Sequence, residues 1–229
     1  MLKPPVPPAD PDSRNEMNPI LLINPNTSQA TTQMMLEIAR ASLGAQAEVR
    51  GLTMASGVPM IVEEHDLRAA ADTVGAIDVG DACGVIVAAF GDPGIEALRR
   101  RLTVPVVGIG EAAMHEAAQH GRFGIATTTP ALAASIDRKV RQLGLAAAFT
   151  GARFTPGDPT QRGNDPQALE AALAEAVRAC VETDGAQAVV IGGGPLGRAA
   201  QALGQRFAIP VIGPVPAACR AILRALGEH

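Results

Sequence analysis

Short apolar runs alternate with longer amphipathic segments along most of the chain. Eight runs have the length and the Val/Ile content of β-strands, and each precedes a segment with helical spacing. The predicted strands cover residues 19–23, 47–52, 85–88, 106–108, 123–126, 147–154, 188–191 and 211–213. The predicted helices cover residues 29–43, 65–79, 94–101, 111–120, 131–143, 168–183, 197–207 and 217–226. Apolar strands without polar alternation, joined through helices, predict an α/β fold with parallel sheets covered on both faces.

An internal repeat divides this pattern into two halves. Residues 85–113 and 189–218 each contain a strand, a loop of small residues, a helix and a second short strand. The loops read Ala88-Ala89-Phe90-Gly91 in the first copy and Gly192-Gly193-Gly194-Pro195 in the second. The repeat predicts two pseudo-symmetric lobes of about four strands each, with the two loop tips facing one another across a cleft.

The domain boundaries follow from the repeat and from a Pro-rich start. Residues 1–18 contain five prolines without an apolar period, which predicts a disordered tail. The first lobe is expected at 19–122 and the second at 123–213. The last helix, within 214–229, can return to pack on the first lobe.

The carboxyl ends of parallel strands are where open α/β sheets bind ligands. By that rule we expect four loops to lie close together at the carboxyl ends of the strands, and they begin at Asn24, Ala89, Thr127 and Gly193. Small residues let a ligand approach backbone N–H groups, and the helix starts that follow favour negative charge. One or two carboxylates, or the carbonyls of a cyclic amide, would suit such a site.

Composition excludes several other functions. Aromatic residues make up only 2% and the formal net charge is −4, which argues against a nucleic-acid partner. No apolar run approaches the roughly 18 residues of a membrane span, and no signal-peptide pattern begins the chain. Three cysteines and four histidines show no metal-ligand spacing, so we expect neither a metal nor a disulfide framework and predict a cytoplasmic protein.

Four ordered motifs resemble the aspartate/glutamate racemase superfamily, and within it the hydantoin and allantoin racemase branch. They are Ile23-Asn24-Pro25-Asn26-Thr27-Ser28, the stretch from Ala89 to Gly94, the stretch from Gly108 to His115, and the stretch from Phe123 to Thr128. The resemblance runs from about residue 19 to the C-terminus. It implies a two-lobed fold with the site between the lobes, a small-molecule substrate, no cofactor and a homo-oligomer.

The resemblance also implies two cysteines that face the α-carbon of the substrate from opposite sides. One removes a proton as the thiolate, and the other returns a proton. In this chain their positions align with Ala89 and Gly193, which carry neither thiol. Because a methyl group or a hydrogen cannot transfer a proton, the sequence argues against two-thiol racemisation.

Other residues near the predicted cleft are candidates for catalysis or binding. Candidate catalytic residues are Asp92, Glu111, His115, Glu63 and His65. Each also has an ordinary structural role available, such as capping a helix or facing solvent. Candidate substrate-binding residues are Asn24, Ala89, Phe90, Gly91, Thr127, Thr128, Gly193, Gly194 and Pro195.

Three functions remain open at this point. The first is an enzyme that acts on a small carboxylate or cyclic amide without cysteine, by ring opening, isomerisation or a lyase reaction. The second is a racemase or epimerase that uses carboxylate or histidine bases. The third is a non-catalytic small-molecule binder, or a variant whose thiols were replaced.

Overall fold

The computed structural model describes residues 18–158 and 165–227. The tail predicted at 1–18 falls, apart from its last residue, outside the described residues. None of the helices that the structure describes is both long and apolar enough to cross a membrane.

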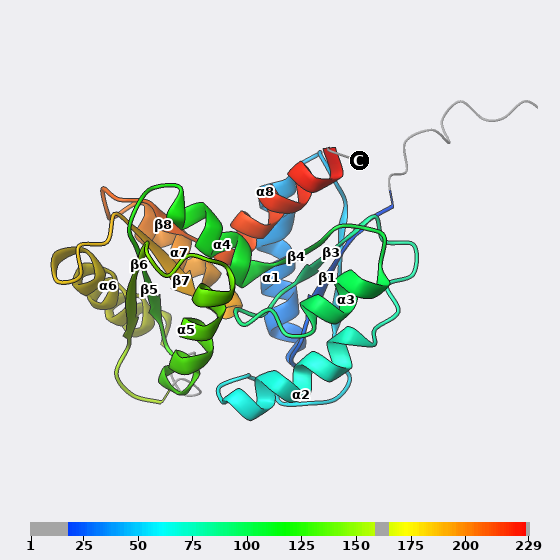
Figure 1. Ribbon diagram of the computed structural model, residues 1–229, viewed down its shortest axis with the longest axis horizontal. Helices are drawn as coiled ribbons and strands as arrows, with labels where there is room; N and C mark the ends of the chain where they lie inside the picture. The colour runs from blue at the N-terminus through cyan, green and yellow to red at the C-terminus, as the bar shows by residue number, and fades with distance from the viewer. Residues whose placement is uncertain (1–17, 159–164, 228–229) are drawn as a thin grey trace, which may run out of the picture.

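Within the described residues, eight parallel strands form two four-stranded sheets, which confirms the predicted fold class (Figure 1). The first sheet has the order β2-β1-β3-β4 and the second has the order β6-β5-β7-β8. The strands are β1 (Ile20–Asn24), β2 (Val49–Thr53), β3 (Gly84–Val87), β4 (Val106–Gly108), β5 (Phe123–Thr127), β6 (Phe149–Phe154), β7 (Ala188–Gly192) and β8 (Val211–Ile212). The same order in both sheets is the structural counterpart of the sequence repeat.

In the part of the chain that the structure describes, eight α-helices follow the strands in the regular alternation that the pattern predicts. They are α1 (Gln29–Leu43), α2 (Glu64–Gly75), α3 (Ile95–Arg101), α4 (Ile109–Ala118), α5 (Ala133–Gln142), α6 (Pro166–Glu182), α7 (Gly197–Gly204) and α8 (Pro214–Gly227). Local chemistry sets several starts: the Ser28 side chain accepts from the Thr31 amide before α1, and Asp165 caps α6, which has Pro166 in its first turn.

Three predicted helix boundaries near the cleft differ from the structure. The helix predicted from Gly94 begins one residue later, because Gly94 has a left-handed φ of 78° that ends the preceding turn. The helix predicted from Glu111 begins at Ile109, directly after β4. The helix predicted at 131–143 is divided into a 3-10 turn, Pro130–Leu132, and α5.

One apolar core lies between the two sheets, and a separate core covers the outer face of each. The inner faces of the sheets contribute Leu22 and Val190, and α1, α4, α5 and α8 fill the space between them. Successive strand residues point to opposite faces, so Leu21 joins the outer core under α2 and α3, and Val189 joins the one under α6 and α7. The two sheets are therefore joined by a shared layer of helices.

Helix α8 packs on α1, α4 and the first sheet rather than on the strand that precedes it. Ile222 is fully buried there, and its side chain lies against the backbone of Gly84 in β3, where a Cβ would come within 3.1 Å.

We predict that Ile222→Ala lowers the free energy of unfolding by about 2–5 kcal/mol, because it opens a cavity between α8 and the first sheet. Arg224→Ala removes an exposed side chain from the same helix and is expected to change stability by no more than about 0.5 kcal/mol. Chemical denaturation of the full chain measures both. Equal effects of the two substitutions would contradict the packing of α8 described here.

Candidate functional site

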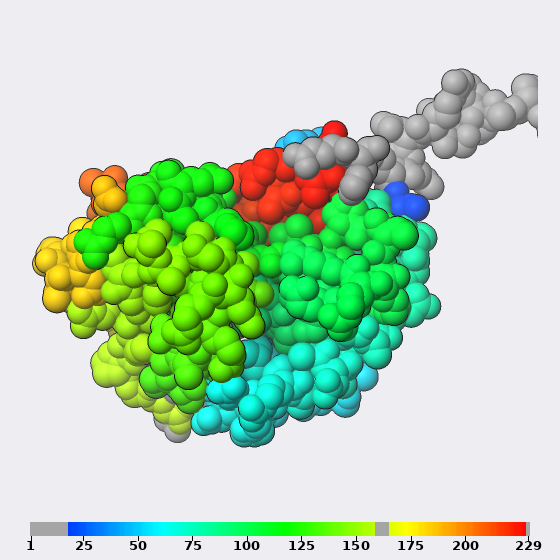
Figure 2. Space-filling view, viewed as in Figure 1, coloured from blue at the N-terminus to red at the C-terminus, as the bar shows by residue number. Residues whose placement is uncertain are grey.

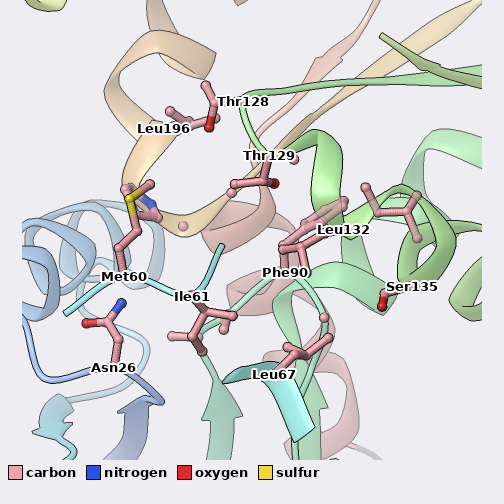
Figure 3. A pocket seen from close by; sticks show the side chains of 18 of the residues that line it. Asn26, Met60, Ile61, Leu67, Phe90, Thr128, Thr129, Leu132, Ser135 and Leu196 are labelled. Carbon is pink, nitrogen blue, oxygen red and sulfur yellow. The ribbon is translucent and has the colours of Figure 1, made fainter. Parts of the chain in front are cut away.

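The carboxyl ends of both sheets border one cavity. Its floor and walls come from the loop after β3, the loop after β7, the segment that enters α2, and the 3-10 turn Pro130–Leu132 with α5. Figure 3 shows Met60, Ile61 and Phe90 around this space, together with Thr129 and Leu132. The cavity volume is about 80 Å³, which favours a compact ligand.

Most of the predicted substrate-binding residues line this cavity. They are Ala89, Phe90, Gly91, Thr128, Gly193, Gly194 and Pro195. Both loop tips of the repeat therefore border the same space, and Phe90 of the first tip reaches the second, where a Cβ on Gly192 would lie 3.1 Å from its ring.

Asn24 and Thr127 are placed behind the cavity and are not part of its lining. The Asn24 amide donates to the side chains of Asn26 and Thr32, at 2.9 Å each, and so shapes the turn that brings Asn26 to the cavity. The Thr127 hydroxyl donates to the Gly192 carbonyl at 2.5 Å and ties β5 to β7. Both side chains are fully buried and hydrogen-bonded within the protein.

Three of the five candidate catalytic residues lie away from the cavity. Glu63 and His65 are exposed at the start of α2, and His115 is exposed on α4. The His65 ring lies 3.2 Å from Asp66 on its own helix. None of the three lines the cavity.

The other two candidates, Asp92 and Glu111, are buried and do not line the cavity, and Asp92 borders a neighbouring groove between α2, α3 and α5. The carboxylate of Asp92 accepts the amides of Gly110 at 2.7 Å and Glu111 at 2.8 Å, and so caps α4. The carboxylate of Glu111 accepts hydrogen bonds from both terminal nitrogens of Arg99. Asp92 has a φ of 48°, which is unusual for a residue with a side chain, and its turn holds the carboxylate against α4.

Burial controls the charge of Asp92. The loss of hydration raises the pKa of its carboxyl from 3.8 to about 6, and the negative charge of Glu111 adds to this effect. The Lys139 ammonium and the Gly110 amide oppose the rise without cancelling it. Burial therefore moves the pKa of Asp92 well above the usual range of a carboxyl group.

Lys139 is a residue of this site that the sequence predictions missed. It comes from α5, lines the cavity, and places its Nζ 2.9 Å from Asp92 Oδ2 and 4.0 Å from Glu111 Oε2. A signal was present in the sequence, because only two of the 19 basic residues are lysines, at positions 3 and 139. Lys139 was missed because it lies on the predicted amphipathic helix 131–143, where a cation is usually exposed to solvent.

A model of the Asp/Glu/hydantoin racemase family matches residues 20–222. The chain belongs to this family. The family assignment agrees with the resemblance found in the motifs, and relatives that match most of the chain are named as racemases, which are enzymes.

Individual relatives agree with the family model. A hydantoin racemase from Paenarthrobacter aurescens is 29% identical over 207 residues, which cover 88% of each chain. An allantoin racemase structure from Klebsiella pneumoniae has 31% identity and a TM-score of 0.85, and the match covers 92% of this chain and 89% of that one. A variant of arylmalonate decarboxylase shares the fold, with 16% identity, a TM-score of 0.62 and coverage of 92% and 93%.

The three cysteines of this family member do not take the place of thiols at the loop tips. Cys83 precedes β3, Cys180 lies in α6 and Cys219 lies in α8, and none of them lines the cavity. Burial raises the pKa values of the Cys180 and Cys219 thiols to about 12, which keeps both thiols protonated.

We predict a pH-dependent contribution of Asp92 to stability. Its pKa is higher in the folded protein than in the unfolded chain, so the stabilisation is present below pH 4 and is lost as pH rises through about 6. Relative to Asp92→Asn, the wild type should lose about 2 kcal/mol of unfolding free energy between pH 4 and pH 7. Denaturation at each pH measures this, with Asp72→Asn, an exposed carboxylate of α2, as control. A constant difference between wild type and Asp92→Asn would contradict the prediction.

Proposed function

We propose that this family member is an enzyme that acts on a small carboxylate or cyclic amide without cysteine. Ring opening, isomerisation and lyase chemistry are the reaction types that this proposal includes. The observation that carries it is the pair of residues at the two loop tips. Ala89 and Gly193 both border the cavity, and neither has a group that can transfer a proton.

The polar groups of the cavity support a ligand with an anionic or carbonyl group. Thr128, Thr129 and Ser135 supply hydroxyls, Asn26 supplies an amide, and Lys139 supplies a positive charge. The names of the relatives, hydantoin racemase and allantoin racemase, support cyclic amides as the first compounds to test. Because the same fold also occurs in a decarboxylase, the fold alone does not determine the reaction.

The placement of the acidic residues weighs against a racemase that uses carboxylate or histidine bases. Asp92 and Glu111 lie outside the cavity lining and are bound to α4 and to Arg99. Glu63, His65 and His115 lie outside it as well. Two opposed bases would have to reach the α-carbon from positions that none of these five side chains occupies.

A non-catalytic binder is the second candidate. One observation favours it: among the described residues, the cavity lining contains no thiol, imidazole or carboxylate side chain.

Cytoplasmic localisation and homo-oligomeric assembly stay predictions.

Proton NMR in D₂O distinguishes these functions. The purified full chain is mixed separately with hydantoins, allantoin and small α-substituted carboxylates. New products without prior α-deuteration support the proposed thiol-free enzyme, and deuterium at the α-carbon of an otherwise unchanged compound supports a racemase. Saturable binding without either change supports the binder and contradicts the proposal.

We predict that Ala89→Cys combined with Gly193→Cys produces α-proton exchange on a hydantoin substrate. The backbone at Gly193 is extended, with a φ of 161°, so a side chain is compatible with it. A Cβ would meet the Leu196 side chain at 3.2 Å, a contact that a small movement of this side chain relieves. The exchange is measured by loss of the α-proton signal in D₂O.

The matched control is Ala89→Ser combined with Gly193→Ser, which adds side chains of similar size without an acidic proton near neutral pH. Exchange by the cysteine pair and not by the serine pair is the expected result. If a folded cysteine pair is as inactive as the serine pair, the two tips do not face a common α-carbon.

A further inference from the structure

Lys139 is the only side chain with a full charge in the described lining of the cavity. Its side chain is 12% exposed, and it extends from α5 toward the first sheet. It also borders an outer groove between α2, α3 and α5, which lies on the face shown in Figure 2. A buried ammonium requires partners, and Asp92 supplies one hydrogen-bond acceptor at 2.9 Å.

The two acids beside Lys139 have cationic or dipolar partners of their own. Both oxygens of Asp92 accept amides at the N-terminus of α4, where the helix dipole stabilises negative charge. Glu111 is bound by the two terminal nitrogens of Arg99, and its nearest approach to the Lys139 Nζ is 4.0 Å. The bond to Asp92 uses one of the three N–H donors of Lys139, and two donors remain for a ligand.

The choice of lysine at this position differs from the rest of the described chain. The other ion pairs between well-separated residues use arginine, as in Arg50–Asp81, Arg153–Asp184 and Arg206–Glu170. Arginine presents a wide planar fork, whereas lysine presents a compact charge with donors that rotate toward a ligand. A compact cation suits a small cavity that must hold both the ligand and the charge that binds it.

The rest of the cavity lining determines how polar the uncharged part of the ligand can be. Met60, Ile61, Leu67, Phe90, Leu132 and Leu196 contribute apolar surface. A second charged group on the ligand would lose its hydration here without an oppositely charged partner from the described lining. The cavity is matched to one negative charge attached to a small apolar group.

We propose that Lys139 binds the carboxylate of the substrate, so that the cavity selects a small monocarboxylate with an apolar group over a neutral cyclic amide. This proposal rests on the proposed function in one respect, that this cavity is where the substrate binds. Lys139 is the residue that determines the charge of the ligand, and Asp92 and Glu111 are positioning residues that hold its ammonium at the cavity wall.

The test compares a carboxylate with its neutral isostere. Titration calorimetry at pH 7.5 measures binding of isovalerate and isovaleramide to the full chain. The wild type should bind isovalerate at least tenfold more tightly, because a charge-assisted hydrogen bond is stronger than a neutral one. Lys139→Met should bring the two affinities within about twofold of each other, and Lys139→Arg should keep a preference for isovalerate.

The matched control is Arg138→Gln, which removes a neighbouring charge from α5. Arg138 is half exposed, pairs with Glu64 and does not line the cavity, so the tenfold preference should persist. Far-UV circular dichroism and a cooperative thermal transition verify that each variant is folded.

A second measurement does not depend on any substitution. Because the chain has lysines only at positions 3 and 139, labelling with ¹³Cε-lysine gives two resonances in a heteronuclear spectrum. Isovalerate should shift the Lys139 signal in a saturable manner and leave the Lys3 signal unchanged, and isovaleramide should shift it less.

Each result has a defined consequence. Equal affinity of the wild type for the two probes, retention of the preference in folded Lys139→Met, or equal shifts of both lysine signals would each overturn this proposal. Lys139-dependent binding without turnover of any compound in the NMR assay would overturn the proposed enzyme and leave this proposal intact. Turnover of neutral hydantoins with no preference for isovalerate would do the opposite.

Discussion

The two halves of the molecule are held together by the apolar layer of helices between their sheets. Helices α1, α4, α5 and α8 bury side chains against the inner faces of both sheets in one continuous core. Because the layer is shared, the sheets cannot be oriented independently of each other. The carboxyl ends of β3 and β7 consequently border the same cavity, and the repeat in the sequence becomes a pair of opposed loops.

The buried charged residues near Lys139 are the energetically least favourable feature of the contact between the two halves. Removing Asp92, Glu111 and Lys139 from water opposes folding unless each finds partners. The amides of α4 and the guanidinium of Arg99 stabilise the acids, and Lys139 crosses from α5 to meet them. The raised pKa of Asp92 and its left-handed backbone indicate that this compensation is incomplete. Cost of this kind is typical of functional sites in proteins.

The scaffold does not itself forbid the two-thiol arrangement that the family resemblance implies. Gly193 has an extended backbone that any residue adopts, and Ala89 differs from cysteine by a single sulfur atom. This chain therefore keeps the family fold while differing at two side chains from the arrangement that the resemblance implies. That separation of fold from reaction is common among folds that support many functions.

The sequence by itself determined the alternation of eight strands and eight helices, the division into two halves, and the loops that border the cavity. An apolar run is a local signal, so a strand such as β3, which contains Val85 to Val87, can be recognised from its own residues. The tertiary structure alone decided that Asn24 and Thr127 face the protein interior, that Asp92 caps α4, and that Lys139 enters the cavity. Hydrogen-bond partners distant in sequence, 18 residues apart for Asp92 and Gly110, set these roles, and no periodicity encodes them.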